Sequence, residues 1–221
     1  FFVQVVVAFL VVYIGDLRID NFYGVLGFNE IPELYSIIFS ISVIIFIINS
    51  FNLTDGLDGL AASLGLFILI SFAIIFYTNG KLFDCTLACA GVSALFAFWL
   101  YNRPPARIFM GDGGSLIIGF IIACCAIRAC NTPIEPAGVI NPVFILCILA
   151  YPAIDTLRVF TVRVFAGKSP FSADRNHIHH LLIDKDFNHG WASFFAVSYC
   201  AVLTFICFFL IDFPNLSFFI M

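Results

Sequence analysis

The amino-acid sequence predicts an all-α membrane protein, a polytopic bundle of about seven transmembrane helices in one integral-membrane domain over 1–221. Of its 221 residues, 62% are hydrophobic and only 11% are charged, whereas a soluble domain carries about 25% charged residues. The mean hydropathy is +1.07, and such an apolar surplus argues against both a soluble globular fold and disorder. The apolar residues form continuous runs, which favours helices over the alternating strands of a barrel.

Seven apolar runs are candidates for the spanning helices, each of which needs about 20 residues. They cover 1–14, 31–48, 60–77, 82–101, 115–129, 139–154 and 192–211. Several are short for a straight span, and the first looks clipped at its start. We find no internal repeat and no linker that would divide the chain.

Seven spans place the loops 49–59, 102–114 and 155–190 on one side of the membrane. These loops hold seven of the ten Lys and Arg residues, so the positive-inside rule predicts that they face the cytoplasm. The formal net charge of −4 gives no basic field for nucleic acid, and we expect no nucleic-acid partner.

The first of these loops is rich in carboxylate and amide side chains. It supplies Asn49, Asn52, Asp55 and Asp58 and contains no Lys or Arg. Spacings of three place Asn52, Asp55 and Asp58 near one face of a helical turn, and oxygen ligands of this kind suit a hard divalent cation. The alternative is that Asp58 only caps the helix that follows.

The second loop carries Asp112 among three glycines, directly before an apolar run. Glycine allows a ligand to approach the backbone closely, and a helix N-terminus favours anions. The loop could therefore hold a metal with a phosphate, or Asp112 could simply cap the helix. Phe109 could stack on a base or face lipid.

The third loop contains Asp-Arg-Asn-His-Ile-His-His at 174–180, which holds three of the four histidines. Beside Arg175 this cluster has the character of an anion clamp, because guanidinium groups suit phosphate oxygens. The alternative is a solvated interfacial loop, and we interpret the separate His189 as an ordinary surface residue. Carboxylates, glycines and basic groups on one side of an apolar body suggest phosphoryl transfer between a soluble and a lipid partner.

At three stretches the sequence resembles the polyprenyl-phosphate N-acetylhexosamine-1-phosphate transferase family. They are Asn-Ser-Phe-Asn-Leu-Thr-Asp-Gly-Leu-Asp-Gly-Leu-Ala at 49–61, Phe-Met-Gly-Asp-Gly-Gly-Ser at 109–115, and the motif at 174–180. The resemblance implies that a lipid phosphate attacks the β-phosphorus of a UDP-aminosugar and that UMP leaves. It also implies Mg²⁺ as cofactor, with Mn²⁺ as the alternative.

The resemblance assigns roles residue by residue. Asp112 and Asn52 would bind the metal. The catalytic group would be Asp55, Asp58, His177, His179 and His180, with the histidines holding the diphosphate or the sugar. Substrate would be bound by Asn49, Asn102, Phe109, Gly111 and Arg175.

The pattern His-Ile-His-His, in place of three consecutive histidines, is similar to that of members acting on UDP-GlcNAc and related sugars. We therefore expect a UDP-N-acetylhexosamine donor, an undecaprenyl phosphate acceptor and membrane lipid as partners, and a homodimer stays open. The resemblance places the protein in the bacterial cytoplasmic membrane, with the site facing the cytoplasm.

One motif of the family, Asp-Asp-x-x-Asp ahead of a span like 1–14, has no counterpart here, because the chain contains no Asp-Asp pair. We expect that 1–221 is the C-terminal part of a larger enzyme and is inactive alone. A secondary transporter and a non-catalytic relative are the alternatives. The spans are nearly free of charge while the loops concentrate it, which favours an enzyme over a transporter.

Overall fold

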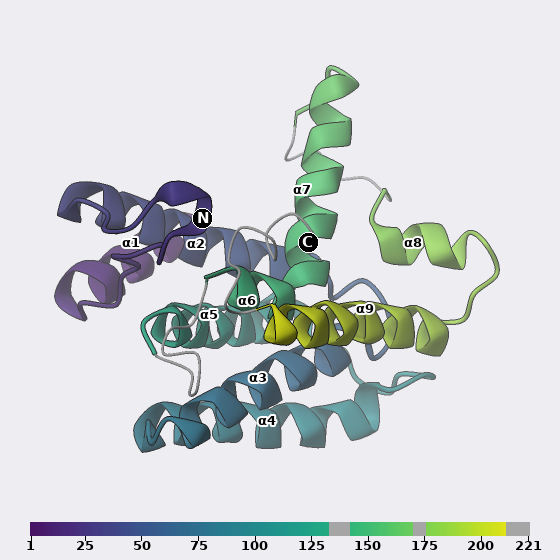
Figure 1. The fold of residues 1–221 in the computed structure, drawn as a ribbon. Coiled ribbons are helices and arrows are strands. Elements are labelled where there is room, and N and C mark those ends of the chain that lie inside the picture. The colour runs from purple at the N-terminus through teal and green to yellow at the C-terminus, as the bar shows by residue number, and fades with distance from the viewer. Residues whose placement is uncertain (133–141, 170–175, 211–221) are drawn as a thin grey trace.

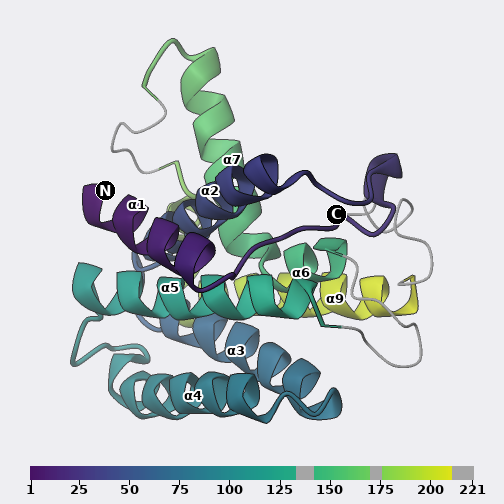
Figure 2. The ribbon, with the colours of Figure 1, turned by 90° about the vertical axis from the view of Figure 1, so that its left-hand side faces the viewer.

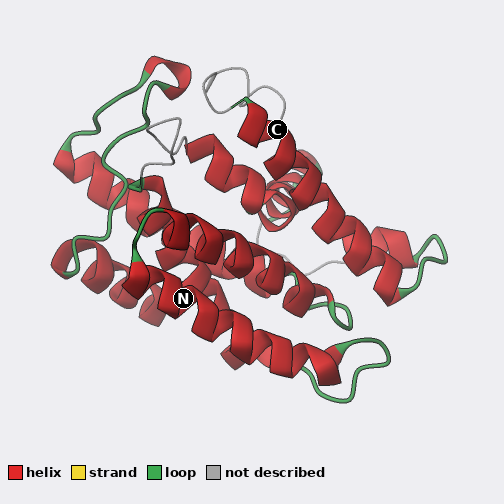
Figure 3. Cartoon of the chain, turned by 60° about the horizontal axis from the view of Figure 1, so that its bottom comes forward, coloured by secondary structure: helices red, strands yellow, loops and turns green. Residues whose placement is uncertain are grey.

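The computed structural model describes residues 1–132, 142–169 and 176–210, and these residues form a helical bundle (Figure 1). The segments 133–141, 170–175 and 211–221 lie outside the described residues. Within the described ranges the secondary structure is helical throughout, apart from turns and an isolated antiparallel bridge between Asn21 and Glu30 (Figure 3). The predicted all-α fold is therefore confirmed.

Five helices are long and apolar enough to cross a membrane. They are α2 (Glu33–Asn52), α3 (Leu60–Thr78), α4 (Leu82–Asn102), α5 (Gly111–Cys130) and α9 (His189–Phe209). The first predicted span is a shorter apolar helix made of α1 (Phe2–Phe9) and the π-helical turn η1 (Leu10–Ile14). A 3₁₀ turn, η2 (Val25–Gly27), lies in the connection from η1 to α2.

The predicted span 139–154 is not a straight helix. Within it, α6 (Pro142–Ile148) and α7 (Ala150–Phe165) meet at an angle of 86°. The chain breaks at Leu149, just before Pro152, which lies in the first turn of α7. Proline is tolerated there because the first N–H groups of a helix have no intrahelical partner, whereas a continuous helix would need that N–H. As a result α7 rises away from the bundle (Figure 2).

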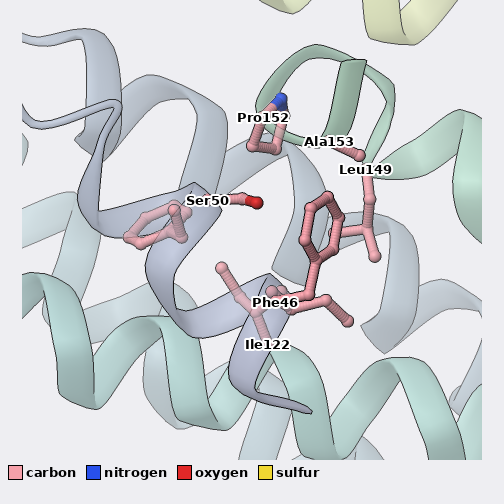
Figure 4. Close-up of a pocket in the computed structure, with 8 residues that line it drawn as sticks. Phe46, Ser50, Ile122, Leu149, Pro152 and Ala153 are labelled. Carbon is pink, nitrogen blue, oxygen red and sulfur yellow. The ribbon is translucent and has the colours of Figure 1, made fainter. Parts of the chain in front are cut away.

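A small apolar pocket lies where this bend packs against α2 and α5. Its lining residues come from α2, α5 and the bend, and Ser50 is its polar member (Figure 4). The Ser50 hydroxyl is buried and has no hydrogen-bond partner among the described residues. The kink therefore leaves packing incomplete on the side of α2 that leads to Asn52.

Two other boundaries differ from the sequence prediction, and both matter for the site. Helix α2 continues through Asn52, and α5 begins at Gly111 rather than at residue 115, because glycines and polar side chains are accommodated in the terminal turns. The expected loop 155–190 is also wrong in part, since residues 155–165 continue α7 and Ile178–Ile183 form α8.

The core consists of the packed faces of these helices. The α3–α4 and α2–α5 pairs pack most extensively. The α2–α5 contact is close because Gly119 is buried against the backbone of Ile48, where an added Cβ would lie 3.1 Å from the Ile48 carbonyl oxygen. This contact aligns the end of α2 with the start of α5.

Candidate functional site

The C-terminus of α2 meets the N-terminus of α5 through polar side chains. Asn52, the last residue of α2, donates from Nδ2 to Oδ1 of Asp112 (3.2 Å) and to Oγ of Ser115 (2.7 Å). Ser115 is fully buried, whereas Asp112 is exposed in the first turn of α5. The two residues predicted to bind metal are therefore in direct contact.

Asp55 joins the same junction from the turn between α2 and α3. Its Oδ2 accepts a hydrogen bond from the backbone N–H of Gly111 at 3.0 Å. Gly111 has φ of +63°, a conformation that glycine adopts without strain. Burial raises the pKa of the Asp55 carboxyl, the hydrogen bond from Gly111 lowers it, and the negative charge of Asp112 raises it further.

These residues fit a magnesium ion by their chemistry. Asp55 and Asp112 bring two carboxylates close enough to repel each other, and the Oδ1 of Asn52 adds an amide oxygen. Across the described ranges, neither carboxylate is paired with Lys or Arg, and no group of three or more His, Cys, Asp or Glu forms a ready-made metal cage. Mg²⁺ usually takes one or two carboxylates and completes its shell with water and substrate phosphate, so this donor set is sufficient.

Asp58 lies in the same turn but contacts different elements. Its Oδ2 accepts from the backbone N–H of Ala106 at 3.1 Å, and its own N–H lies 3.3 Å from Nδ1 of His189. Asp58 does not cap α3, because Gly59 occupies the N-cap position and no side chain caps it. Asp112 does not cap α5 either, since Met110 is at that position and no side-chain cap bond forms. Both capping alternatives are therefore wrong.

Asn102 links the loop 49–59 to the loop 102–114 through hydrogen bonds. Its Oδ1 accepts from the N–H of Gly59 (3.0 Å), and its Nδ2 donates to the carbonyl oxygen of Ile108 (2.8 Å). The side chain is 2% exposed. Phe109, one residue further, is 77% exposed, so its ring is available to a ligand. Asn49 instead points to α1, where Nδ2 contacts Oε1 of Gln4 at 3.3 Å.

His179 and His180 lie against the turn between α2 and α3. An added Cβ at Gly56 would lie 2.8 Å from Nε2 of His179 and 3.5 Å from Nε2 of His180. The rings of His177 and His179 stack with centroids 5.5 Å apart, and those of His179 and His180 are 4.5 Å apart. The histidine stack therefore lies directly against the segment that carries Asp55 and Asp58.

His179 is the most buried of the three histidines, with 1% exposure. Its Nδ1 lies 3.4 Å from the hydroxyl of Tyr151. Burial, together with the neighbouring His180, lowers its pKa to about 3. The ring is therefore neutral at physiological pH and contributes hydrogen bonds rather than positive charge. Arg175 lies outside the described residues, so its predicted contact with substrate stays a prediction.

Two residues to which the sequence assigns no role in the site belong to this region, His189 and Asp155. His189 is not an ordinary surface residue, because its Nδ1 lies against Asp58, 3.5 Å from Oδ2. Asp155 is 2% exposed and contacts His177. A signal for Asp155 is present in the sequence: Asp155 and Arg158 continue the helical spacing from Tyr151, past the end of the predicted span 139–154.

An open groove adjoins the site on the α4 and α9 side. It is lined by Asp58, Trp99, Arg103, Pro104, Pro105, Asn188, His189 and Gly190. All three predicted polar loops thus contribute residues to one end of the bundle.

The sequence is similar to known proteins over most of its length. The sequence profile of "Glycosyl transferase family 4" matches residues 1–130. A "Probable undecaprenyl-phosphate N-acetylglucosaminyl 1-phosphate transferase" of Bacillus subtilis (strain 168) is 34% identical over 192 residues, covering 86% of this chain and 52% of the relative.

Two further relatives carry similar names. A "Decaprenyl-phosphate N-acetylglucosaminephosphotransferase" of Mycolicibacterium smegmatis is 30% identical over 200 residues, covering 82% of this chain and 49% of the relative. An "Undecaprenyl-phosphate alpha-N-acetylglucosaminyl 1-phosphate transferase" of Yersinia pestis is 35% identical over 144 residues, covering 63% and 39% respectively. The chain spans about half the length, or less, of these curated relatives.

Proposed function

This chain belongs to glycosyl transferase family 4, and we propose that the protein transfers N-acetylglucosamine 1-phosphate from UDP-N-acetylglucosamine to undecaprenyl phosphate. An oxygen of the lipid phosphate forms a bond to the β-phosphorus of the donor, the bond from that phosphorus to the bridging oxygen breaks, and UMP leaves. The names of the relatives support the sugar phosphate and the polyprenyl acceptor. This transfer would begin the assembly of a cell-envelope glycan.

One observation carries the proposal, namely the convergence of three polar loops at one end of an apolar bundle. Asn52 contacts Asp112, Asp55 contacts Gly111, and Gly56 packs against His179. The protein is a multi-pass membrane protein with five to six helices of spanning character among its described residues. A polar site at the end of such a bundle is suited to join a water-soluble donor to a lipid acceptor.

In this proposal Asp112 and Asn52 hold Mg²⁺, with Asp55 close by. When bound, the ion would offset negative charge on the diphosphate. Asp55 and Asp58 hold the turn between α2 and α3 against the two neighbouring loops through backbone N–H groups. They thereby fix the position of the donor, and positioning supplies much of the rate enhancement in phosphoryl transfer.

The remaining site residues would bind the donor. We propose that the exposed ring of Phe109 stacks on uracil, while Asn102 holds the loop that presents Phe109. His177 and His180, together with Arg175, would contact phosphate or sugar oxygens, and Gly111 leaves room for close approach. Asn49, which lies on α2, would support the site through its contact with Gln4 of α1 and would not touch substrate.

We also propose that this end of the bundle faces the cytoplasm of a bacterial cell, where the donor is made. Arg103, Arg107 and Lys185 lie in the loops of this end, in agreement with the positive-inside rule.

The decisive experiment measures UMP release by the purified protein, expressed from its complete gene, with UDP-N-acetylglucosamine and undecaprenyl phosphate. We expect Mg²⁺-dependent release that Asp112→Asn reduces at least about a hundred-fold, because the variant loses one anionic ligand. Asp20→Asn is the matched control, an exposed acid far from the site, and it should leave the rate unchanged. Solute uptake into vesicles without UMP release would contradict the proposal and favour a transporter.

A further inference from the structure

Side chains from one turn of α7 bind the segment that carries the histidine stack. Asp155 Oδ2 lies 2.7 Å from Nδ1 of His177, and Asp155 Oδ1 accepts from the N–H of Ile178 at 2.9 Å. One turn later, Arg158 donates to the carbonyl oxygen of Asn176 and lies 3.1 Å from Asp155 Oδ1. Three consecutive residues, 176–178, are thus bound by two side chains of a single helix.

The Asp155 carboxylate is an unusual group to bury at this position. Asp155 is 2% exposed, and most of the other buried residues of α7 are apolar or uncharged. Burying a charge is unfavourable unless hydrogen bonds and an opposite charge compensate it. Both of its oxygens are used, and both reach toward the histidine segment. Asp155 therefore serves to bind the histidine segment and does not merely fill space between helices.

We infer that Asp155 is the positioning residue of the histidine stack, fixing the orientation and the tautomer of His177 for the sugar-phosphate transfer proposed above. A carboxylate that faces Nδ1 requires the ring proton on that atom, because two acceptors cannot form a hydrogen bond. Nε2 of a neutral His177 is then the atom left to face a ligand. Through the ring stack, the orientation of His177 also limits where His179 and His180 lie.

The bend between α6 and α7 explains how Asp155 reaches its target. A straight helix through 142–165 would carry Asp155 along the bundle axis, whereas the 86° break turns α7 toward the segment 176–178. The kink before Pro152 is therefore part of the site, because it sets the direction of the helix that anchors the histidines.

The first test reads the His177 ring without substrate. Nitrogen-15 NMR of histidine-labelled protein, with His177→Gln for assignment, should show His177 protonated at Nδ1. Asp155→Asn should shift or average that signal, because an amide can face the ring with either its oxygen or its nitrogen. Thr156→Val, at a buried position next along α7, should leave it unchanged. An unchanged His177 signal in Asp155→Asn would overturn the inference.

The second test is a double-mutant cycle on transfer activity. We expect Asp155→Asn to lower kcat about ten- to a hundred-fold with little change in the KM for the donor, as for other carboxylates that orient a histidine. In the His177→Gln background the same change should cost almost nothing further, because Asp155 acts through that ring. Additive losses in the cycle would overturn the inference.

If Asp155→Asn does not fold, Asp155→Glu replaces it in the activity cycle, and Asp155→Ser replaces it in the NMR test, where loss of the carboxylate should likewise shift or average the His177 signal. Glutamate keeps the charge but displaces the carboxylate, so it should retain the Nδ1 proton and still lower kcat. Failure of the proposed function would look different, since no sugar phosphate would be transferred by any variant while the His177 signal would still depend on Asp155.

Discussion

Gly56 matters because its missing side chain lets two segments touch. An added Cβ would lie 2.8 Å from Nε2 of His179, closer than real contacts allow. We expect Gly56→Ala to push His179 away and to lower transfer activity, with a loss of stability of about 1–3 kcal/mol. UMP release and thermal unfolding in detergent would measure the two effects.

A double variant separates this clash from other causes. If the contact with His179 is responsible, Gly56→Ala combined with His179→Ala should behave like His179→Ala alone. An activity in the double variant far below that of His179→Ala would show that Gly56 acts in another way.

His179 should also make the protein sensitive to acid. Burial lowers its pKa to about 3 in the folded protein, whereas an unfolded histidine titrates near 6.5. Between these values the unfolded chain binds the extra proton, so the contribution of His179 to stability is complete above pH 6.5 and is lost as the pH falls toward 3. Each pH unit in that window costs about 1.4 kcal/mol.

Unfolding temperatures measured from pH 7 to pH 4 check this expectation. The wild-type protein should lose stability more steeply than His179→Gln, whose side chain does not titrate. Parallel curves for the two proteins would show that His179 is already accessible to protons in the folded state.

Among the elements, the α2–α5 pair controls the geometry of the proposed metal site. A Cβ added at Gly119 would lie 3.1 Å from both the Cα and the carbonyl oxygen of Ile48. These are backbone atoms, which cannot move aside as side chains do. We expect Gly119→Ala to separate the helices, to cost about 1–3 kcal/mol, and to weaken the contact between Asn52 and Asp112. Thermal unfolding and the Mg²⁺ concentration needed for half-maximal activity would report both changes.

Gly113→Ala, in the same helix, is the matched control for stability. A Cβ added at Gly113 would have nothing within 4 Å. There alanine should stabilise α5 by about 1 kcal/mol through helix propensity alone. Equal effects of the two substitutions would show that the α2–α5 contact is looser than the structure indicates.

At this scale the sequence predicts well what depends on local composition. Each of the seven apolar runs is mostly helical where it is described, because length and hydropathy suffice to define such segments. The break at Leu149 and the start of α5 at Gly111 were not predicted, because proline and glycine are compatible with several local structures. Their outcome depends on packing against other helices.

Across the whole molecule, the sequence predicts which loops share one end but not which side chains meet. Asp58 and His189 are 131 positions apart, and Asp155 and His177 are 22 apart. Motif spacing carries no information about such distances, so the sequence alone assigns His189 to the surface and gives Asp155 no role. The predicted pairing of Asn52 with Asp112 followed from the resemblance of both motifs to one family.

The orientation of the molecule in the membrane gives the last expectation. The connections at the site end contain Arg103, Arg107 and Lys185, whereas the turn between α3 and α4 at the other end holds only Lys81. Loops rich in Lys and Arg are retained on the cytoplasmic side. Green fluorescent protein inserted after Asp186, between α8 and α9, should therefore fluoresce, and alkaline phosphatase inserted there should be inactive. Insertion after Gly80 should give the opposite pair of results, because the helices between these positions carry the chain across the membrane. Phosphatase activity after Asp186 would place the site outside the cytoplasm, away from any nucleotide-sugar donor, and would contradict both the orientation and the proposed reaction.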